Sequence, residues 1–434
     1  MEYVYRRLNI YNYDDKQLVK QHIRTIDMIL FYFIISNLFL LRFIKVNYEL
    51  FYILDFFLLI YSLIHLRNIR FNISFVGYTS FLVLLMIIGS NIEKFGFNEN
   101  VINNLLMIYT PLCYFAYFSY LKKTYSLDVL EKLYSVCFYL LNIHFVINTI
   151  IIFIQIKTTS FLIGRFLAGN PHPFDHWTGL VGMNGVSVLN FLWIVTVLFN
   201  MYKIKKTKSQ LMIVWLAVQF SIMGYLSIAI DNKMLIQTLL IFVFIFFLIN
   251  FLTSDKFVIT KITLLTLLFI SIAFVGITFS NSQYEYVSED TFISNFIYDP
   301  NSVPSPHNER AYLNYLAYYK FDASSQGIGF SNVNLNNQTI HVHLGINSSS
   351  LLLILGGLFF LGFTIHIYTL VLYKCIEIKG GRIKKIIIYL SLLITITTCA
   401  YATQIFRDQY ITIALFLITF IFYLTSNKKE TNTA

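Results

Sequence analysis

The stretch Ser348–Tyr373, SSSLLLILGGLFFLGFTIHIYTLVLY, decides the fold class because it contains no Asp, Glu, Lys or Arg. A helix rises about 1.5 Å per residue, so about 20 apolar residues cross a hydrocarbon core about 30 Å thick. We therefore predict that this stretch spans a membrane as a helix.

The composition of the whole chain extends this prediction. Of its 434 residues, 57% are hydrophobic and 12% are charged, more apolar surface than one water-soluble core can bury. We predict a single all-α integral membrane domain over residues 1–434. The 43 Phe and 31 Tyr are expected at lipid-facing and interfacial positions, where a ring buries area and a phenol stays hydrated.

Apolar runs of spanning length recur along the chain, and we predict twelve transmembrane helices. Their approximate limits are Ile26–Ile44, Tyr48–Leu66, Asn72–Ser90, Val101–Leu121, Leu133–Ile156, Thr178–Tyr202, Gln210–Ile230, Met234–Leu252, Ile262–Ser280, Ser348–Tyr373, Ile386–Thr403 and Gln409–Leu424. Two substantial connections then share one side of the membrane: a first outer loop over residues 157–177, and a long outer loop over residues 281–347 between the ninth and tenth helices.

The distribution of positive charge predicts the orientation. Lys and Arg near span ends stay preferentially on the cytoplasmic side, and with both termini inside, about 23 of them are cytoplasmic and about nine are outside. We therefore attribute the net charge of +10 to the orientation of the chain in the membrane and not to nucleic-acid binding. The short cytoplasmic links leave no room for a nucleotide-binding domain, and no glycine-rich nucleotide motif occurs. The four Cys imply no disulfide framework.

The first outer loop gathers polar residues in GRFLAGNPHPFDHWTGLVGMNG, Gly164–Gly185. Arg165 follows the fifth span closely, where its guanidinium suits bidentate contact with a phosphate or carboxylate; the alternative is a side chain that reaches lipid headgroups. Two prolines predict a rigid non-helical segment in which His172, Asp175 and His176 can pair. Metal binding by these three is a weaker alternative, because their spacing matches no metal motif.

The long outer loop contains SPHNERAYLNYLAYYKF, Ser305–Phe321, whose spacing predicts an amphipathic helix at the membrane surface. Arg310 lies at its start, where backbone N–H groups favour an anion. Further on, His341 and His343 point the same way if the chain is extended, and either suits a general base near neutral pH. Lys233, in a tight outer connection, is a further candidate cation or an ordinary interfacial anchor.

Taken together, these motifs resemble the O-antigen polymerase and ligase superfamily, and most closely the Wzy-type polymerases. GRFLAGNPHPFDHWTGLVGMNG is similar to the family's arginine, glycine and asparagine pattern opening a span, and SIAIDNK (Ser227–Lys233) to its Ser-Arg motif, with lysine for arginine. ERAYLNYLAYYKFDASSQGIGF (Glu309–Phe330) followed by HVHLGINSSSLLLILGGLFFLG (His341–Gly362) is similar to the family's long outer loop. The resemblance covers about Ile163 to Gly362 and rests on motif order.

The resemblance implies a metal-independent, cofactor-free glycosyltransferase in a bacterial inner membrane. Its substrate would be an oligosaccharide repeat unit on undecaprenyl pyrophosphate, polymerised at the outer leaflet into capsule, O-antigen or exopolysaccharide. Arg165, Arg310 and Lys233 would stabilise the departing pyrophosphate, and His341 or His343, or alternatively His172 or His176, would take the hydroxyl proton. Asp175 and Asn184 would bind substrate. The implied partners, besides the bilayer, are the chain-length regulator and flippase of the same pathway.

Two alternatives stay open. A ligase of the same superfamily would transfer the glycan to another acceptor. A lipid-linked oligosaccharide flippase would carry charged residues deep in its spans; here the buried acids are mainly Asp27 and Asp55, and neither lies at the centre of an obvious inverted repeat.

Overall fold

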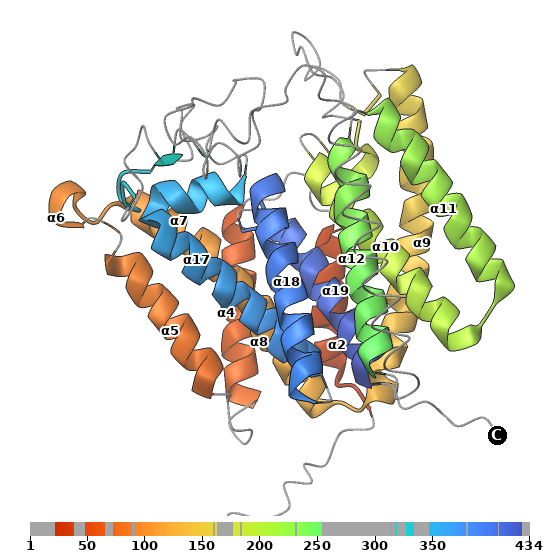
Figure 1. The fold of residues 1–434 in the computed structure, drawn as a ribbon, viewed down its shortest axis with the longest axis horizontal. Coiled ribbons are helices and arrows are strands. Elements are labelled where there is room, and N and C mark those ends of the chain that lie inside the picture. The colour runs from red at the N-terminus through yellow and green to blue at the C-terminus, as the bar shows by residue number, and fades with distance from the viewer. Residues whose placement is uncertain are drawn as a thin grey trace, which may run out of the picture.

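The computed structural model describes residues 22–38, 48–65, 73–88, 90, 92–158, 161–162, 177–182, 185–230, 232–253, 314, 317–318, 327–333, 347–378, 381–406 and 408–427. Every regular element in these ranges is helical (Figure 1). The elements are α2 (Thr25–Ser36), α4 (Tyr48–His65), α5 (Ile73–Ile88), α6 (Ile92–Phe95), α7 (Glu99–Tyr109), α8 (Pro111–Thr124), α9 (Leu127–Lys157), η5 (Gly179–Val181), α10 (Val186–Thr207), α11 (Gln210–Ala229), α12 (Lys233–Thr253), α17 (Ser348–Ile376), α18 (Arg382–Ala402) and α19 (Gln409–Asn427).

Eight helical stretches in the described ranges are long and apolar enough to cross a membrane: α7 together with α8, and α9, α10, α11, α12, α17, α18 and α19. The prediction of an all-α, multi-pass membrane architecture is confirmed at this level. The count of twelve stays a prediction, because α2, α4 and α5 contribute shorter apolar helices and the span expected at Ile262–Ser280 lies outside the described residues.

One predicted boundary is wrong. The sixth span was placed from Thr178, but α10 begins at Val186. The preceding residues form η5 and an irregular turn, in which the Thr178 hydroxyl donates to the Gly182 carbonyl. Gly179–Val181 are apolar like the residues of a spanning helix, so hydropathy alone extended the predicted span into this loop.

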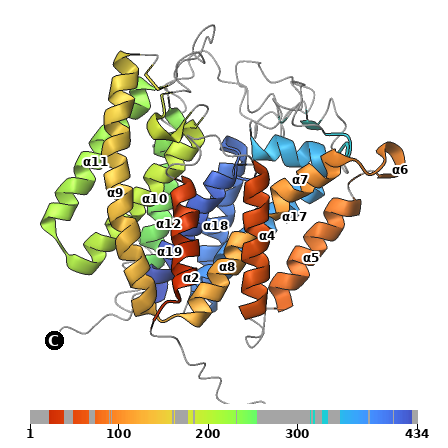
Figure 2. The ribbon, with the colours of Figure 1, turned by 180° about the vertical axis from the view of Figure 1, so that it is seen from behind.

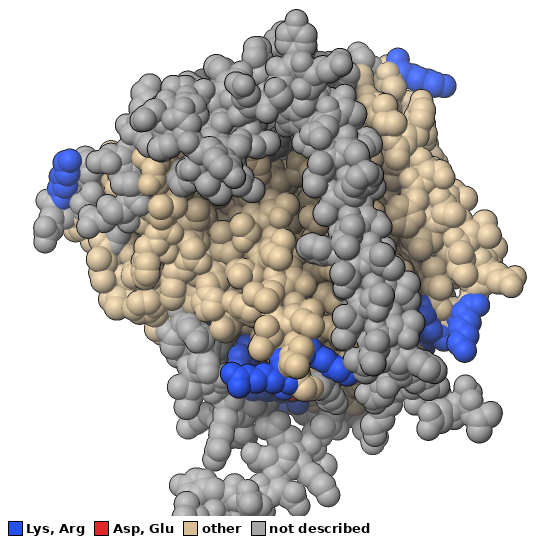
Figure 3. All heavy atoms as spheres, in the orientation of Figure 1, with Lys and Arg blue, Asp and Glu red and all other residues tan. Residues whose placement is uncertain are grey.

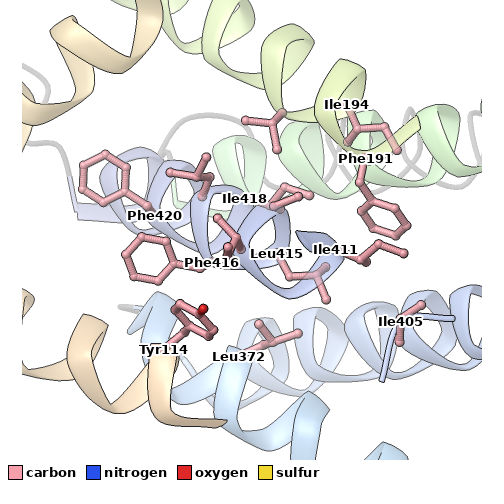
Figure 4. Packing of buried hydrophobic residues seen from close by; sticks show 14 of the residues in the cluster. Tyr114, Phe191, Ile194, Leu372, Ile405, Ile411, Leu415, Phe416, Ile418 and Phe420 are labelled. Atoms are coloured by element: carbon pink, nitrogen blue, oxygen red, sulfur yellow. The ribbon is translucent and has the colours of Figure 1, made fainter. Parts of the chain in front are cut away.

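The centre of the bundle is α19, whose spanning window is fully buried. It packs against α10, α12, α17 and α8, and Figure 4 shows its Phe416 and Ile418 among side chains of α8, α10 and α17. Seen from behind, α2, α4 and α9 cover the face opposite to α18 (Figure 2). A helix that is apolar all round and buried on every side is a central element, whereas α11 and α18 are mostly exposed and present apolar side chains outward.

Exposed aromatic residues such as Phe57, Tyr139 and Phe359 fit the expected outward positions, but many others lie in the core. Six tyrosines are among the largest fully buried side chains: Tyr114, Tyr117, Tyr120, Tyr134, Tyr202 and Tyr368. Several of their hydroxyls bond to partners inside the bundle, as Tyr134 does to the carbonyl of Phe199 at 2.9 Å. These phenols link helices because an apolar interior leaves a polar group no solvent partner.

Most of the described Lys and Arg residues gather at one of the two ends of the bundle. α8, α10 and α17 end and α18 begins at the lower end of Figure 1, where Lys and Arg gather in Figure 3. We call this the basic end, and its cations include Lys122, Lys123, Lys203, Lys205, Lys206, Lys374, Arg382, Lys384 and Lys385. We call the opposite end, where α7, α10 and α17 begin, the loop end.

Candidate functional site

The structure describes one of the predicted site residues, Lys233, which begins α12 at the loop end. The other predicted site residues lie outside the described residues: Arg165, His172, Asp175, His176, Asn184, Arg310, His341 and His343. The amphipathic helix predicted at Ser305–Phe321 also falls mostly outside them.

The described residues that flank these positions share the loop end. Leu162 precedes Arg165 and follows the end of α9, with the Gln155 side chain donating to the Phe161 carbonyl at 3.4 Å. Asn314, four residues after Arg310, accepts a 2.8 Å hydrogen bond from the Ser349 hydroxyl at the start of α17. Both arginines are therefore attached to chain that reaches the same end of the bundle.

The N-terminus of α17 is closed by groups of the protein itself. Asn347 caps the Ser350 N–H at 2.9 Å, and the Ser348 N–H donates to the Thr403 carbonyl at 2.9 Å. The Ser348 hydroxyl in turn accepts the Phe406 N–H at 3.1 Å. A helix N-terminus binds an anion through free N–H groups, and these two N–H groups are already used.

The motif GIGF, Gly327–Phe330, packs on a break in α17. Gly357 has φ +74°, which interrupts the helix, and the carbonyl of Ile354 accepts the Ile328 N–H at 2.8 Å. A Cβ on Gly327 would lie 2.6 Å from the Ile354 oxygen and 2.7 Å from the Gly356 nitrogen. Only glycine permits this approach, because Gly327 also has φ +67°.

Replacing Gly327 by alanine is expected to lower the free energy of unfolding by about 2–5 kcal/mol, from overpacking of about 1–3 kcal/mol and a left-handed φ that costs about 1–2 kcal/mol. Denaturant titration of the purified protein in mixed micelles measures this. Gly362→Ala, on the helix α17 against which Gly327 packs, is the matched control, since its Cβ meets nothing within 4 Å. Equal stability of the two variants would contradict the close packing.

Asparagines of α7 and its N-cap hold the segment that follows. The Asn104 amide donates to the carbonyls of Phe330 at 2.9 Å and Val333 at 2.8 Å. Asn98 donates to the Ser331 carbonyl at 2.9 Å. Part of the long connection is thereby fixed to the bundle beside the start of α17. Sequence reasoning missed this role, because an asparagine in an amphipathic helix gives no signal of its distant partner.

The other loop-end connection is held in a similar way. The Gly179 N–H donates to the Gln155 side chain at 2.9 Å, and the Leu180 N–H to the Asn148 side chain at 2.6 Å. Both acceptors lie on α9 and are buried. Buried amides in an apolar helix thus position the end of the loop that contains Arg165.

A buried acid lies at the loop-end half of the bundle. Asp55 of α4 is fully buried, and the polar side chains beside it are Thr110, Tyr114 and Gln409. The Gln409 amide donates to the Thr110 hydroxyl at 3.2 Å. Among the described residues, neither oxygen of Asp55 forms a hydrogen bond of regular geometry, although these three side chains lie within interaction range, and the Tyr114 hydroxyl and the Gln409 oxygen form none either. We call these four residues the Asp55 cluster.

A second buried acid, Asp27, lies near the basic end and is fully bonded. Tyr61 donates to it at 2.8 Å and Tyr120 at 2.9 Å, and Tyr125 donates as well. Burial, together with the hydrogen bond to Asp27, raises the pKa of Tyr125 to about 12, so its hydroxyl keeps its proton as a donor at neutral pH. The two acids therefore differ in kind: Asp27 joins helices, and Asp55 has unused bonding capacity.

The class of protein that emerges is a helical bundle of multi-pass membrane type, with an acid-containing polar cluster beneath one end. The chain matches no protein-family model, no curated protein and no solved structure. Within the described ranges, no three His, Cys, Asp or Glu side chains gather into a group suited to a metal ion.

Proposed function

We propose that this chain is a polysaccharide polymerase that joins lipid-diphosphate-linked oligosaccharide repeat units at the outer face of a bacterial inner membrane. The loop end would face outward and the basic end the cytoplasm, because positive residues stay preferentially inside. Both described ends of the chain, His22 and Asn427, then lie toward the cytoplasmic side.

One observation carries this proposal. The chain flanking Arg165, Arg310 and the two histidines of the long loop reaches the loop end, at Leu162, Asn314 and Asn347, opposite the basic end. The described residues nearest in sequence to these candidate anion-binding and proton-accepting groups therefore lie at one end of the bundle, although they belong to separate connections. We infer that a substrate with a lipid tail in the bilayer and a polar head in water would meet these groups from that side.

In the proposed reaction, a sugar hydroxyl of one repeat unit attacks the anomeric carbon of another chain. The new glycosidic bond forms as the bond between that carbon and the diphosphate oxygen breaks, and the lipid diphosphate leaves with the electron pair. His341 or His343, or alternatively His172 or His176, takes the hydroxyl proton. Arg165 and Arg310 stabilise the negative charge on the leaving diphosphate, with Lys233 as a further cation. No cofactor, metal or nucleotide enters the step.

A flippase for the same lipid-linked units is the second candidate, favoured by one specific observation. Asp55 is an acid wholly buried in the bundle, next to the α7–α8 junction at Pro111, and α17 is also interrupted, at Gly357. Transporters build substrate and ion sites at interrupted helices. A ligase would share the polymerase chemistry and differ in its acceptor.

Deleting the gene in its host distinguishes these candidates by gel analysis of the surface glycan. We expect single repeat units on the carrier or core and loss of the ladder. Finished polymer left on the lipid carrier would identify a ligase instead. Repeat units trapped on the inner leaflet would identify a flippase. An unchanged ladder would contradict all three functions.

A further inference from the structure

The carboxyl group of Asp55 is unusual among the described acids. It is fully buried, and although Thr110, Tyr114 and Gln409 lie within interaction range, neither of its oxygens forms a hydrogen bond of regular geometry in the described ranges. The described ion pairs, Lys122 with Glu377 and Lys206 with Glu131, both lie at the basic end. An ionised carboxylate in an apolar interior is costly unless a positive charge or a proton neutralises it.

The side chains around Asp55 carry oxygen atoms that could still coordinate a cation. The Thr110 hydroxyl, the Tyr114 hydroxyl and the Gln409 side chain lie beside the carboxyl group. Gln409 uses its amide nitrogen on Thr110, which leaves its oxygen for another partner. Thr412, three residues further on α19 and so on the same helix face, also has a buried hydroxyl with no hydrogen-bond partner among the described residues.

We propose that the Asp55 cluster binds an alkali-metal cation between α4, α8 and α19. Hard oxygen ligands suit hard cations. One carboxylate with neutral hydroxyl and amide oxygens balances a single positive charge, whereas a divalent ion would leave an uncompensated charge in an apolar interior. The ligands come from three helices, so the cation would hold these helices together.

The local backbone supports an ion site. Thr110 directly precedes Pro111, which has no N–H to donate to the Met107 carbonyl, so the helix ladder is interrupted beside the cluster. Interrupted helices are recurrent ion sites in membrane proteins because carbonyls freed from the ladder are available to a cation. Cation binding at the Asp55 cluster would also affect the loop end, because the turn before α19 contacts the start of α17 through Phe406 and Ser348.

This inference does not depend on the proposed glycosyl transfer, and its test uses no glycan. The full-length protein is purified in detergent at pH 8 with choline chloride, and its thermal unfolding midpoint is followed as NaCl or KCl replaces choline chloride at constant ionic strength. We expect at least one alkali cation to raise the midpoint saturably, by about 2 °C or more. Asp55→Asn, which keeps the shape and removes the charge, should abolish the shift.

Two further variants sharpen the test. Tyr114→Phe removes one proposed ligand oxygen and should raise the half-saturating cation concentration several-fold, which gives a readout if Asp55→Asn does not fold. Glu131→Gln is the matched control: it changes a carboxyl group at the basic end that already has partners in Tyr202 and Lys206, and should keep the wild-type shift.

Two outcomes would overturn the proposal. The wild-type midpoint would be the same in all three salts, or Asp55→Asn would keep the full shift. If the first is found, a shift that appears in Arg407→Gln would identify the Arg407 guanidinium, two residues before Gln409, as the charge that neutralises Asp55.

Discussion

Alanine at Arg165 or Arg310 is expected to abolish the glycan ladder while leaving the amount of protein in the membrane unchanged. Each guanidinium is proposed to stabilise charge that develops on the leaving diphosphate, and removing one such group typically lowers a rate by about 10²–10³-fold. Loss of that size reduces chain growth below detection on a gel. Immunoblotting of membranes and electrophoresis of the surface glycan measure the two quantities together.

Lysine variants and a nearby cation serve as controls for this prediction. Arg165→Lys keeps the charge and loses the bidentate geometry, so partial chain growth should return. Lys157→Ala removes an exposed cation at the end of α9 and should leave the ladder intact, since that charge is not assigned to the diphosphate. Normal ladders in both alanine variants would remove the proposed anion site. A lost ladder in Lys157→Ala would show that loop-end charge matters without a specific site.

Replacing Asp27 by alanine should have the largest effect on stability, lowering the free energy of unfolding by about 3–5 kcal/mol. The change leaves three buried phenol donors without their acceptor; each lost hydrogen bond costs about 0.5–1.5 kcal/mol, and an orphaned buried donor about 1–3 kcal/mol. These bonds join α2 to α4, α8 and the connection that precedes α9. Denaturant titration in mixed micelles measures the effect.

Partial variants separate this network from general packing. Tyr61→Phe removes one of the three donors and keeps the ring, so a loss of about 1–2 kcal/mol is expected. Asp27→Asn should fall between the alanine and phenylalanine variants, since an amide oxygen still accepts. Three equal losses would show that the ring packing, and not the hydrogen bonds, holds α2 in place.

Asp27 and Asp55 show which properties of a buried acid can be predicted from the sequence and which cannot. Both acids stand out as charges inside apolar runs, and both are buried in the structure. Their roles differ because of residues far away in the chain: Asp27 meets tyrosines about 30 to 100 positions on, and Asp55 meets Thr110, Tyr114 and Gln409. No local pattern contains such pairings, since they arise only when helices pack.

The loops show the same division. GIGF ends Glu309–Phe330, a stretch that carries part of the family resemblance, yet only the structure shows that its partner is the Ile354 carbonyl beside the break at Gly357. The start of α10 was misplaced by apolar loop residues that η5 buries against α9. The positions of the predicted arginines and histidines stay predictions, because only their neighbours are described.

The sequence by itself determined that the chain forms apolar helices with lysine and arginine gathered at particular helix ends, because helix length, hydropathy and charge are local properties that the bilayer selects directly. Only the tertiary structure decided which helix is central, which acid is satisfied and which glycine touches a broken helix. Those outcomes depend on contacts between distant residues, and their energies appear only once the helices are side by side.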